Sequence, residues 1–385
     1  MIAGFPRAEF ERRCSALHGH MHADGIDALL LTTPADIFYV TGFLTRFWES
    51  PARPWFVILP AGKGPRTVIP SIGAPLMAEG FTDDILTWDA PHPTDDGVSL
   101  LSEALRAAVP AAGTLGLPMG LETHLRMPLA DWGRVTQSLG ARRIIDATHT
   151  VERVREIKSD GEIARIKATC ALAAKAFAQV PDLVRAAPRL DAVARGYQAA
   201  LLHSGADWVS YLASAAGPEG YGDIIAPAGP QPLRSGDVLM LDTGAVKDGY
   251  FCDFDRNFAI DPPSACVERT HKALFEATDE ALAALQPGLR ACDVHRILAE
   301  GLVARGAQPG GGRLGHGLGI TLTEWPSFTP LDQTELRAGM VLTLEPSAQT
   351  RPGKLLVHEE NIVLRADGAE LLSPRAAPEM EVIPL

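Results

Sequence analysis

The stretch RSGDVLMLDTGA at residues 234–245 recurs as RAGMVLTLEPSA at residues 337–348. In both copies Asp242 and Glu345 occupy the same place, after Arg, Gly, Val and two Leu at matched positions. Each copy follows two segments of helical character and leads into a further strand. The helical segments are 160–185 and 189–204 in the first half and 263–286 and 291–306 in the second. Apolar strands can resemble one another by chance, but the matched order of elements favours a duplicated helix, helix, hairpin unit.

The first copy contains a hairpin signal. Two strand-like runs, GDVLMLDTGAV and YFCDFDRNFAI, are separated by Lys-Asp-Gly at 247–249, and Asp-Gly between such runs typically forms a two-residue turn. That turn would place Asp242 opposite Asp255, with Asp253 as the diagonal neighbour on the same face. Like charges so close destabilise a hairpin unless a cation lies among them. A solvated polar face is the alternative.

The second copy offers further ligands. Glu345 ends a strand before Pro346, and the strand KLLVHEENIVL carries Glu359 and Glu360 on opposite faces, so the residues alone leave open which one points inward. His316 lies in GGGRLGHGLGI, where a neutral imidazole would suit zinc, manganese or cobalt. A structural histidine in a glycine-rich turn is the alternative. A phosphate-binding loop is not indicated, because the strand, GxGxxG, helix order and a P-loop lysine are missing.

The first 150 residues show a different pattern. A polar helix at 9–25 is followed by the strands IDALLLT, WFVILP and PRTVIP, which is an α/β arrangement. Ser159 and Glu162 are spaced as a capping box before a long amphipathic run. A chain of 385 residues also exceeds the size of an ordinary single core, about 250 to 300 residues. We therefore expect domains at 1–152 and 153–385.

Composition excludes several classes of function. A net charge of -12 argues against nucleic acid as a partner, because a phosphate backbone is bound by clustered Lys and Arg. No apolar run approaches the ~20 residues that span a bilayer, and the opening residues lack a signal-peptide pattern, so we expect a cytoplasmic protein without a membrane partner. The five cysteines are scattered and form no C-x-x-C pair, which predicts buried, unpaired thiols.

The ordered motifs LDTG, DFDR, GHGLG, TLEP and HEEN resemble the metallopeptidase superfamily that contains prolidase, aminopeptidase P, methionine aminopeptidase and creatinase. YVTGF and REIKSDGEI resemble the amino-terminal domain and junction of its creatinase and prolidase branch. The resemblance implies an α+β architecture in which a smaller α/β creatinase-like domain precedes a pita-bread catalytic domain. It also implies two divalent metal ions, chosen among Mn, Co, Zn and Fe, and a homodimer.

The resemblance assigns roles to individual residues. The family places its last ligand directly before Asn or Asp, which selects Glu360 rather than Glu359. Glu345 would carry a proton from water to the leaving nitrogen, and His316 and Glu324 (in TEWP) are the other catalytic candidates. The implied metal ligands are Asp242, Asp253, His316, Glu345 and Glu360.

The departures from the family concern the substrate. Proline-specific members carry histidines where this chain has Ile225 and Thr323, and usually Thr where it has Asp255. In the segment TRFWESPARPW, Trp48 and Arg53 are candidates to bind a substrate carboxylate, with a domain-packing loop as the alternative.

The expected function is therefore a dinuclear metal-dependent hydrolase. It would cleave an amide or peptide bond in a small substrate, like an Xaa-Pro peptidase but not necessarily with proline specificity. A metal-dependent lyase or a creatinase-like hydrolase acting on a non-peptide substrate is the alternative. A non-catalytic binding module is a third interpretation, although such relatives usually lose ligands.

Overall fold

The computed structural model describes residues 3–49 and 54–385, so the predicted substrate residue Arg53 lies outside the described residues. The chain divides into two compact units, Met1–Arg155 and Glu156–Leu385. The boundary expected between 152 and 153 falls inside helix α6 (Thr148–Arg155). Across the described ranges, no helix combines the length and the apolarity needed to cross a bilayer.

The first unit is built on a mixed six-stranded sheet in the order β4-β3-β2-β1-β5-β6. The predicted helix at 9–25 and the three predicted strands are confirmed as α1, β1, β2 and β3. The strands are β1 (Ala28–Leu31), β2 (Phe56–Pro60), β3 (Arg66–Pro70), β4 (Asp84–Trp88), β5 (Thr114–Leu117) and β6 (Arg143–Asp146). The helices besides α6 are α1 (Arg7–Asp24), α2 (Pro34–Thr41), α3 (Ala74–Met77), α4 (Val98–Ala108) and α5 (Leu129–Ser138), with short 3-10 turns at Phe47–Glu49 and Ser71–Gly73.

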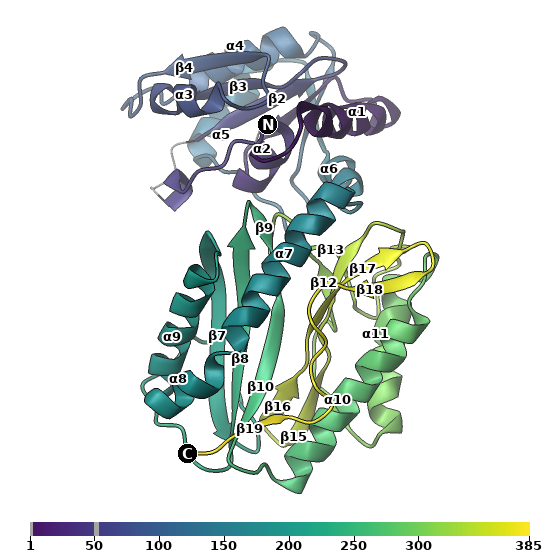
Figure 1. The fold of residues 1–385 in the computed structure, drawn as a ribbon. Coiled ribbons are helices and arrows are strands. Elements are labelled where there is room, and N and C mark those ends of the chain that lie inside the picture. The colour runs from purple at the N-terminus through teal and green to yellow at the C-terminus, as the bar shows by residue number, and fades with distance from the viewer. Residues whose placement is uncertain (1–2, 50–53) are drawn as a thin grey trace. The chain divides into compact units, whose positions relative to one another are not determined.

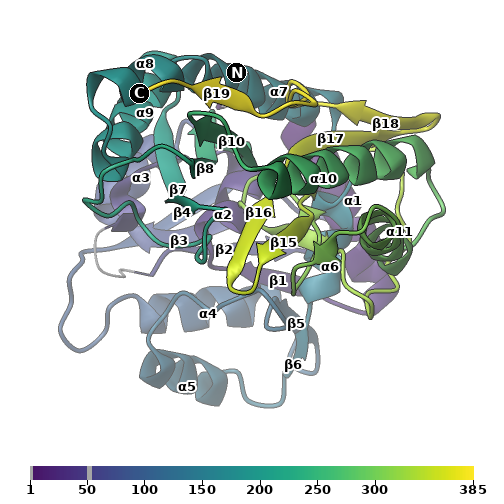
Figure 2. The ribbon, with the colours of Figure 1, turned by 90° about the horizontal axis from the view of Figure 1, so that it is seen from below.

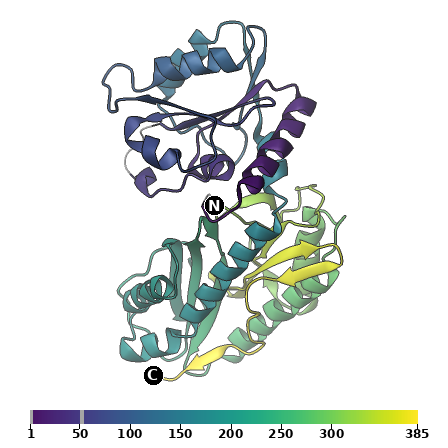
Figure 3. The same cartoon turned by 45° about the horizontal axis from the view of Figure 1, so that its top comes forward.

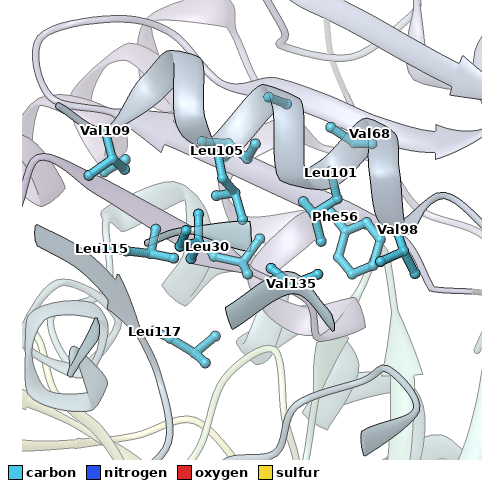
Figure 4. Close-up of a cluster of buried hydrophobic side chains, with 14 residues drawn as sticks. Leu30, Phe56, Val68, Val98, Leu101, Leu105, Val109, Leu115, Leu117 and Val135 are labelled. Atoms are coloured by element: carbon cyan, nitrogen blue, oxygen red, sulfur yellow. The ribbon is translucent and has the colours of Figure 1, made fainter. Parts of the chain in front are cut away.

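The core of this unit lies between α4 and the sheet. Val98, Leu101 and Leu105 recur at helical spacing on one face of α4 and meet Leu30 and Phe56 from the strands (Figure 4). These side chains are buried, and each contributes about 1.5 to 3 kcal/mol by leaving water.

The second unit contains the predicted helix pairs. The capping box of Ser159 and Glu162 is confirmed at the start of α7. The segment 160–185 forms two helices rather than one, because Pro181 in the first turn of α8 cannot continue the hydrogen-bond pattern of α7. The helices are α7 (Asp160–Phe177), α8 (Val180–Ala186), α9 (Leu190–His203), α10 (Ala265–Ala284) and α11 (Ala291–Ala304). Helices α7 and α10 lie on the same side of the strands (Figure 2).

The strands of the second unit form three sheets, with the orders β19-β10-β8-β7, β11-β15-β16 and β13-β12-β14-β17-β18. In the first of these, β9 also pairs with β8. The yellow strands β17 and β18 lie beside the green helices of the second half (Figure 3). The strands of the first half are β7 (Trp208–Pro218), β8 (Asp237–Lys247), β9 (Tyr250–Phe251) and β10 (Phe254–Ile260). Those of the second are β11 (Gln308–Pro309), β12 (His316–Gly317), β13 (Glu324–Ser327), β14 (Val341–Leu344), β15 (Ser347–Arg351), β16 (Lys354–Val357), β17 (Glu360–Arg365), β18 (Gly368–Leu371) and β19 (Glu381–Ile383).

The duplication predicted from the two sequence copies is present as two equivalent strand pairs, β8 with β10 and β14 with β17. Strands β8, β10 and β17 are labelled in Figure 1. In the first pair Leu241 lies opposite Arg256, and in the second Leu344 lies opposite Glu360. Because Leu241 and Leu344 are equivalent in the repeat, so are Arg256 and Glu360. The fold is the α+β architecture that the sequence predicted, in which a smaller α/β unit precedes the duplicated unit in the chain.

The two strand pairs are connected differently. Asp248 and Gly249, both with positive φ (50° and 82°), make the predicted two-residue turn, which leads from β8 into β9. In the second half Pro346 follows β14, and the chain forms the separate hairpin β15–β16 before β17. Cys14, Cys170 and Cys252 are buried as expected, whereas Cys266 and Cys292 are partly exposed.

Candidate metal centre

The first strand pair brings three carboxylates to one face. Asp242 lies directly opposite Asp255, as the turn geometry predicted. Asp253 and Asp255 are two residues apart on the adjoining segment and are both buried. Cys252, the residue before Asp253, is buried, and its thiol lies 3.9 Å from the Thr243 carbonyl oxygen. The hairpin therefore concentrates negative charge on its inner side.

His316 reaches this charge because glycines surround it. A Cβ atom at Gly315 would lie 2.2 Å from the Thr343 carbonyl oxygen, and one at Gly317 would lie 2.0 Å from that of Trp325, so only glycine fits. The Nδ1 atom of His316 lies 2.8 Å from the Gly317 carbonyl oxygen, which favours a proton on Nδ1 and a lone pair on Nε2. Nε2 lies 3.4 Å from Asp253 and 3.6 Å from Glu345.

The second strand pair supplies Glu345 and Glu359. Ligand atoms of Asp253, His316 and Glu359 all lie within 4.8 Å of one another. These three residues are buried, whereas Asp242 and Glu345 are partly exposed. The buried members form the base of the cluster, and the other two give it access to solvent.

Glu360, the predicted last ligand, does not belong to the group of ligand atoms that Asp253, His316 and Glu359 form. Its carboxylate accepts hydrogen bonds from Arg256 (3.2 Å), Arg375 (3.1 Å) and the Ala376 backbone (2.8 Å), and one from Ser373. Glu359, the residue directly before β17, instead offers a carboxylate oxygen within 4.8 Å of the ligand atoms of Asp253 and His316. The motif position before Asn361 misled the choice, because register decides which face is inner.

The electrostatics of the cluster are those of a cation site. Burial, and then the charges of their neighbours, raise the pKa of Asp242 and Glu359 well above the ordinary range. Burial also raises the pKa of Asp253 and Glu345, although Arg313 opposes the shift at both and His316 at Glu345. One oxygen each of Asp242, Glu345 and Glu359 is buried without a hydrogen-bond partner. Such crowded acceptors fit a divalent cation, which prefers oxygen ligands and one imidazole.

Glu324 lies outside this cluster of ligand atoms. Its buried carboxylate accepts hydrogen bonds from Lys158 (3.0 Å) and from the backbone of Ile320 and Thr321. These bonds fix the turn that follows His316. A direct catalytic role for Glu324 stays a prediction.

The predicted substrate residues are dispersed. Ile225 is 75% exposed, and the Thr323 hydroxyl accepts a hydrogen bond from Arg313 at 3.2 Å. Asp255 accepts one from Asn257 at 2.6 Å. Trp48 belongs to the first unit, where it packs against Trp55 and other aromatic side chains. Contacts of these residues with a substrate stay predictions.

Sequence reasoning missed two residues beside the cluster. The Tyr211 hydroxyl donates to the Ile224 carbonyl at 3.2 Å, and burial and then the charges of Asp242 and Asp253 raise its pKa. Arg313 is the cation whose charge reaches both Asp253 and Glu345. Arg313 stands three residues before His316 in the quoted glycine-rich loop, so the loop itself carried a signal for it. Tyr211 has no local motif and is found only through the pairing of β7 with β8.

Comparisons with known proteins agree with this geometry. Residues 164–366 match metallopeptidase family M24, and residues 13–157 match the creatinase/prolidase N-terminal domain. The probable dipeptidase PepE of Mycobacterium bovis is 27% identical over 98% of this chain and 98% of its own length. Dipeptidase PepE from Mycobacterium ulcerans has a TM-score of 0.84 at 24% identity, covering 99% of this chain and 100% of that one. Recombinant prolidase from Thermococcus sibiricus has a TM-score of 0.85 at 23% identity, covering 98% and 99%.

Proposed function

Because this chain belongs to metallopeptidase family M24, we propose that it hydrolyses a dipeptide-like substrate with the aid of two divalent cations. Family membership makes it a metal-dependent peptide hydrolase of the creatinase and prolidase type. The number and identity of the cations belong to the proposal. The residues that would hold them are Asp242, Asp253, His316, Glu345 and Glu359.

One observation carries the proposal, the convergence of Asp253, His316 and Glu359, with Glu345 3.6 Å from His316 and Asp242 close enough to feel the charges of Asp253 and Glu345. Three of these carboxylates have a buried oxygen without a hydrogen-bond partner. Without a cation, such groups would repel one another and take up protons. Bound divalent cations would act as Lewis acids that polarise a carbonyl group and lower the pKa of water. Asp255 adds a further negative charge, which its hydrogen bond from Asn257 stabilises.

Glu345 is suited to move the proton. Its side chain is 24% exposed, against 6% for Asp253 and 2% for His316, so it can meet both water and substrate. Burial and the neighbouring Asp253 raise its pKa, against the opposing charges of His316 and Arg313, and a carboxylate whose proton affinity is raised is suited to accept and then return a proton. Glu345 would take the proton of the attacking water and give it to the leaving nitrogen.

The substrate is proposed from Arg313 and from the relatives. The guanidinium of Arg313 is held by Thr323 at a place where the resemblance expects a histidine. A permanent cation there would favour a substrate with a carboxylate close to the scissile bond, as in a dipeptide. Relatives of the chain are named dipeptidase and prolidase. Because Ile225 and Thr323 replace the two histidines, we propose that cleavage is not restricted to proline.

The test uses metal-free protein loaded with Mn²⁺, Co²⁺ or Zn²⁺ and offered Xaa-Pro dipeptides, other dipeptides and N-substituted amino acids. We expect cleavage of dipeptides with a free carboxylate and little turnover of their amides. Products identified by mass spectrometry separate hydrolysis from a lyase reaction. Asp237→Asn is a matched control for Asp253→Asn, because Asp237 is a buried aspartate on β8 whose carboxylate accepts a hydrogen bond from the Arg234 backbone, outside the cluster.

The proposal fails if metal-loaded protein cleaves none of these substrates, or if turnover persists undiminished after the metal is removed. Selective cleavage of Xaa-Pro dipeptides would overturn the interpretation of Ile225 and Thr323. We also propose a homodimer, which sedimentation of the metal-loaded protein would reveal.

A further inference from the structure

Behind the metal-site carboxylates, the two halves of the duplicated unit join through residues at equivalent positions. Arg256 and Glu360 lie opposite equivalent leucines in the two strand pairs, and they bond each other at 3.2 Å. Glu360 is fully buried, and the side chain of Arg256 is 16% exposed. The repeat has therefore placed opposite charges at matched positions, where they meet between the two halves.

The next residue in each half is an asparagine, and the two asparagines act reciprocally. Asn257 donates from Nδ2 to the Val357 carbonyl at 2.7 Å, and Asn361 donates to the Asp253 carbonyl. Val357 and Asp253 are themselves equivalent, since each lies four residues before its asparagine. The Asp253 backbone N–H in turn donates to Asn361 Oδ1 at 2.9 Å. The backbone of one candidate ligand is thus held by a side chain of the opposite half.

Arg256 also spans the halves through the backbone. Its Nη1 atom donates to the Asp255 carbonyl at 2.6 Å and to the Glu359 carbonyl at 3.1 Å. One guanidinium group therefore touches the main chain of two carboxylate residues from different halves. Arg375, Ser373 and Ala376 hold the other side of Glu360.

We infer that Arg256, Asn257, Glu360 and Asn361 form an inter-hairpin clasp that positions Asp253 and Glu359 and so sets the affinity of the metal site. These four are positioning residues. Arg256 and Asn361 bond the backbone of Glu359 and Asp253, Asn257 bonds that of Val357, and Glu360 holds Arg256. The inference rests on the proposed metal site but makes a claim of its own, that affinity depends on residues outside the ligand set.

The physical reason is the preference of the unbound carboxylates to separate. Asp253 and Glu359 repel each other when ionised, and each comes from a different half. A rigid connection directly behind them prevents that separation before the cation arrives, so less of the binding free energy is lost in ordering the site. Removing such outer partners of metal ligands typically weakens metal binding about 10- to 100-fold.

The experiment titrates metal-free protein with Co²⁺ and follows both heat and visible absorption, so no turnover is needed. We expect Glu360→Gln to weaken Co²⁺ binding about 10- to 100-fold and to change the Co²⁺ absorption bands, because the ligand geometry relaxes. The matched control is Glu156→Gln. Glu156 is a mostly buried carboxylate of the same unit, bonded to Arg337 at 2.8 Å, but it does not join the two strand pairs. We expect its Co²⁺ affinity and spectrum to equal those of the unaltered protein.

Glu360→Gln leaves Arg256 and Arg375 without their shared anion and so destabilises the unit. A milder variant therefore keeps the inference testable if Glu360→Gln does not fold. A cavity of about 240 Å³ borders both arginines and offers water access to them. Ser373→Ala removes one hydroxyl donor to Glu360 and keeps every charge, and we expect a smaller weakening in the same direction. If a folded Glu360→Gln or Ser373→Ala protein binds Co²⁺ with unchanged affinity and spectrum, the clasp is overturned. If the unaltered protein binds no Co²⁺, it is the proposed metal site that fails.

Discussion

The strand pairs β8–β10 and β14–β17 have equivalent registers but distribute their acidic groups differently. In the first, Asp242 and Asp253 are the candidate ligands, and Asp255 is bonded to Asn257. In the second, Glu345 and Glu359 are the candidates, and Val357 stands where the first half has Asp253. Glu359 is equivalent to Asp255. The duplicated scaffold therefore fixes where side chains can converge, whereas the residue at each place decides which of them can serve the metal.

The difference in side-chain length has a geometric explanation. Asp242 lies on the long strand β8 (Asp237–Lys247), which pairs with β7 on one side and with β10 on the other, and Asp253 directly precedes β10. The longer glutamates come from the interrupted half, where β14 ends at Leu344 before Pro346. Glutamate's extra torsion compensates for a backbone that leaves the sheet earlier.

The largest expected effect comes from removing Asp253, a candidate ligand whose equivalent position in the second half holds Val357 and not a carboxylate. Asp253→Asn should abolish metal-dependent turnover, a loss of several kcal/mol or roughly 1000-fold, because the buried base of the site loses its charge. Turnover and metal content by mass spectrometry are the measurements. Near-normal metal content in this variant would show that the first half does not carry the site.

The equivalent pair Glu359 and Asp255 gives the next test. Glu359→Gln should reduce turnover and metal content about 100-fold or more, whereas Asp255→Asn should cost about tenfold, because only Glu359 has an unpartnered oxygen facing the cluster. Both variants remove one carboxylate charge at equivalent positions, so each variant serves as the control for the other. Equal losses would mean that Asp255 is also a ligand.

The fully buried equivalents Leu241 and Leu344 test whether the halves are equally stable. Each Leu→Ala change should lower the free energy of unfolding of the metal-free protein by about 2 to 5 kcal/mol. Denaturant titration measures both values. A much smaller loss at Leu344 would show that the interrupted half packs more loosely than the continuous one.

The carboxylates of both halves predict how stability depends on pH. Asp253 and Glu359 have folded pKa values raised above their ordinary values of 3.8 and 4.5, so the folded metal-free protein keeps protons that the unfolded chain has lost. The stabilisation from this uptake is fully present below pH 3.8 and falls as pH rises through the ordinary and then the raised values. A tenfold difference between the folded and unfolded acid dissociation constants of one group corresponds to about 1.4 kcal/mol.

Thermal unfolding between about pH 4 and 8 measures this dependence, with and without Mn²⁺. Metal should remove the loss at higher pH, because it binds the ionised carboxylates. Metal-free stability that rises with pH over this range would contradict the raised pKa values.

The smallest effects are expected at two turn glycines, Gly249 between β8 and β9 and Gly353 between β15 and β16. Gly249 and Gly353 have φ values of 82° and 74°, and each Gly→Ala change should cost about 1 to 2 kcal/mol because a Cβ atom disfavours this region. Only Gly249→Ala should also weaken Co²⁺ binding, since its turn leads directly into the Asp253 segment. If Gly249→Ala and Gly353→Ala weaken Co²⁺ binding equally, the proposed difference between the β8–β9 turn and the β15–β16 hairpin is contradicted.

Much of this site could be predicted from the sequence, because the repeat and the Asp-Gly turn are local signals. They place Asp242 opposite Asp255 without any structure. The choice between Glu359 and Glu360 depended on the register of β14 with β17, which no turn determines, since the β15–β16 hairpin intervenes. Extending the repeat would have helped, because Asp255-Arg256-Asn257 aligns with Glu359-Glu360-Asn361 and assigns matching faces.

Residues 261–264 connect β10 to α10 and are partly or fully exposed. A cut in such a segment is tolerated when the flanking elements are well packed. Here it would yield two polypeptides, one with Asp242 and Asp253 and the other with His316, Glu345 and Glu359. The site would then lie at a heterodimer interface closed by the Arg256–Glu360 bond. Metal would strengthen the reassociation of the two fragments, so the enzyme could be rebuilt as a two-part sensor that reports divalent cations through association.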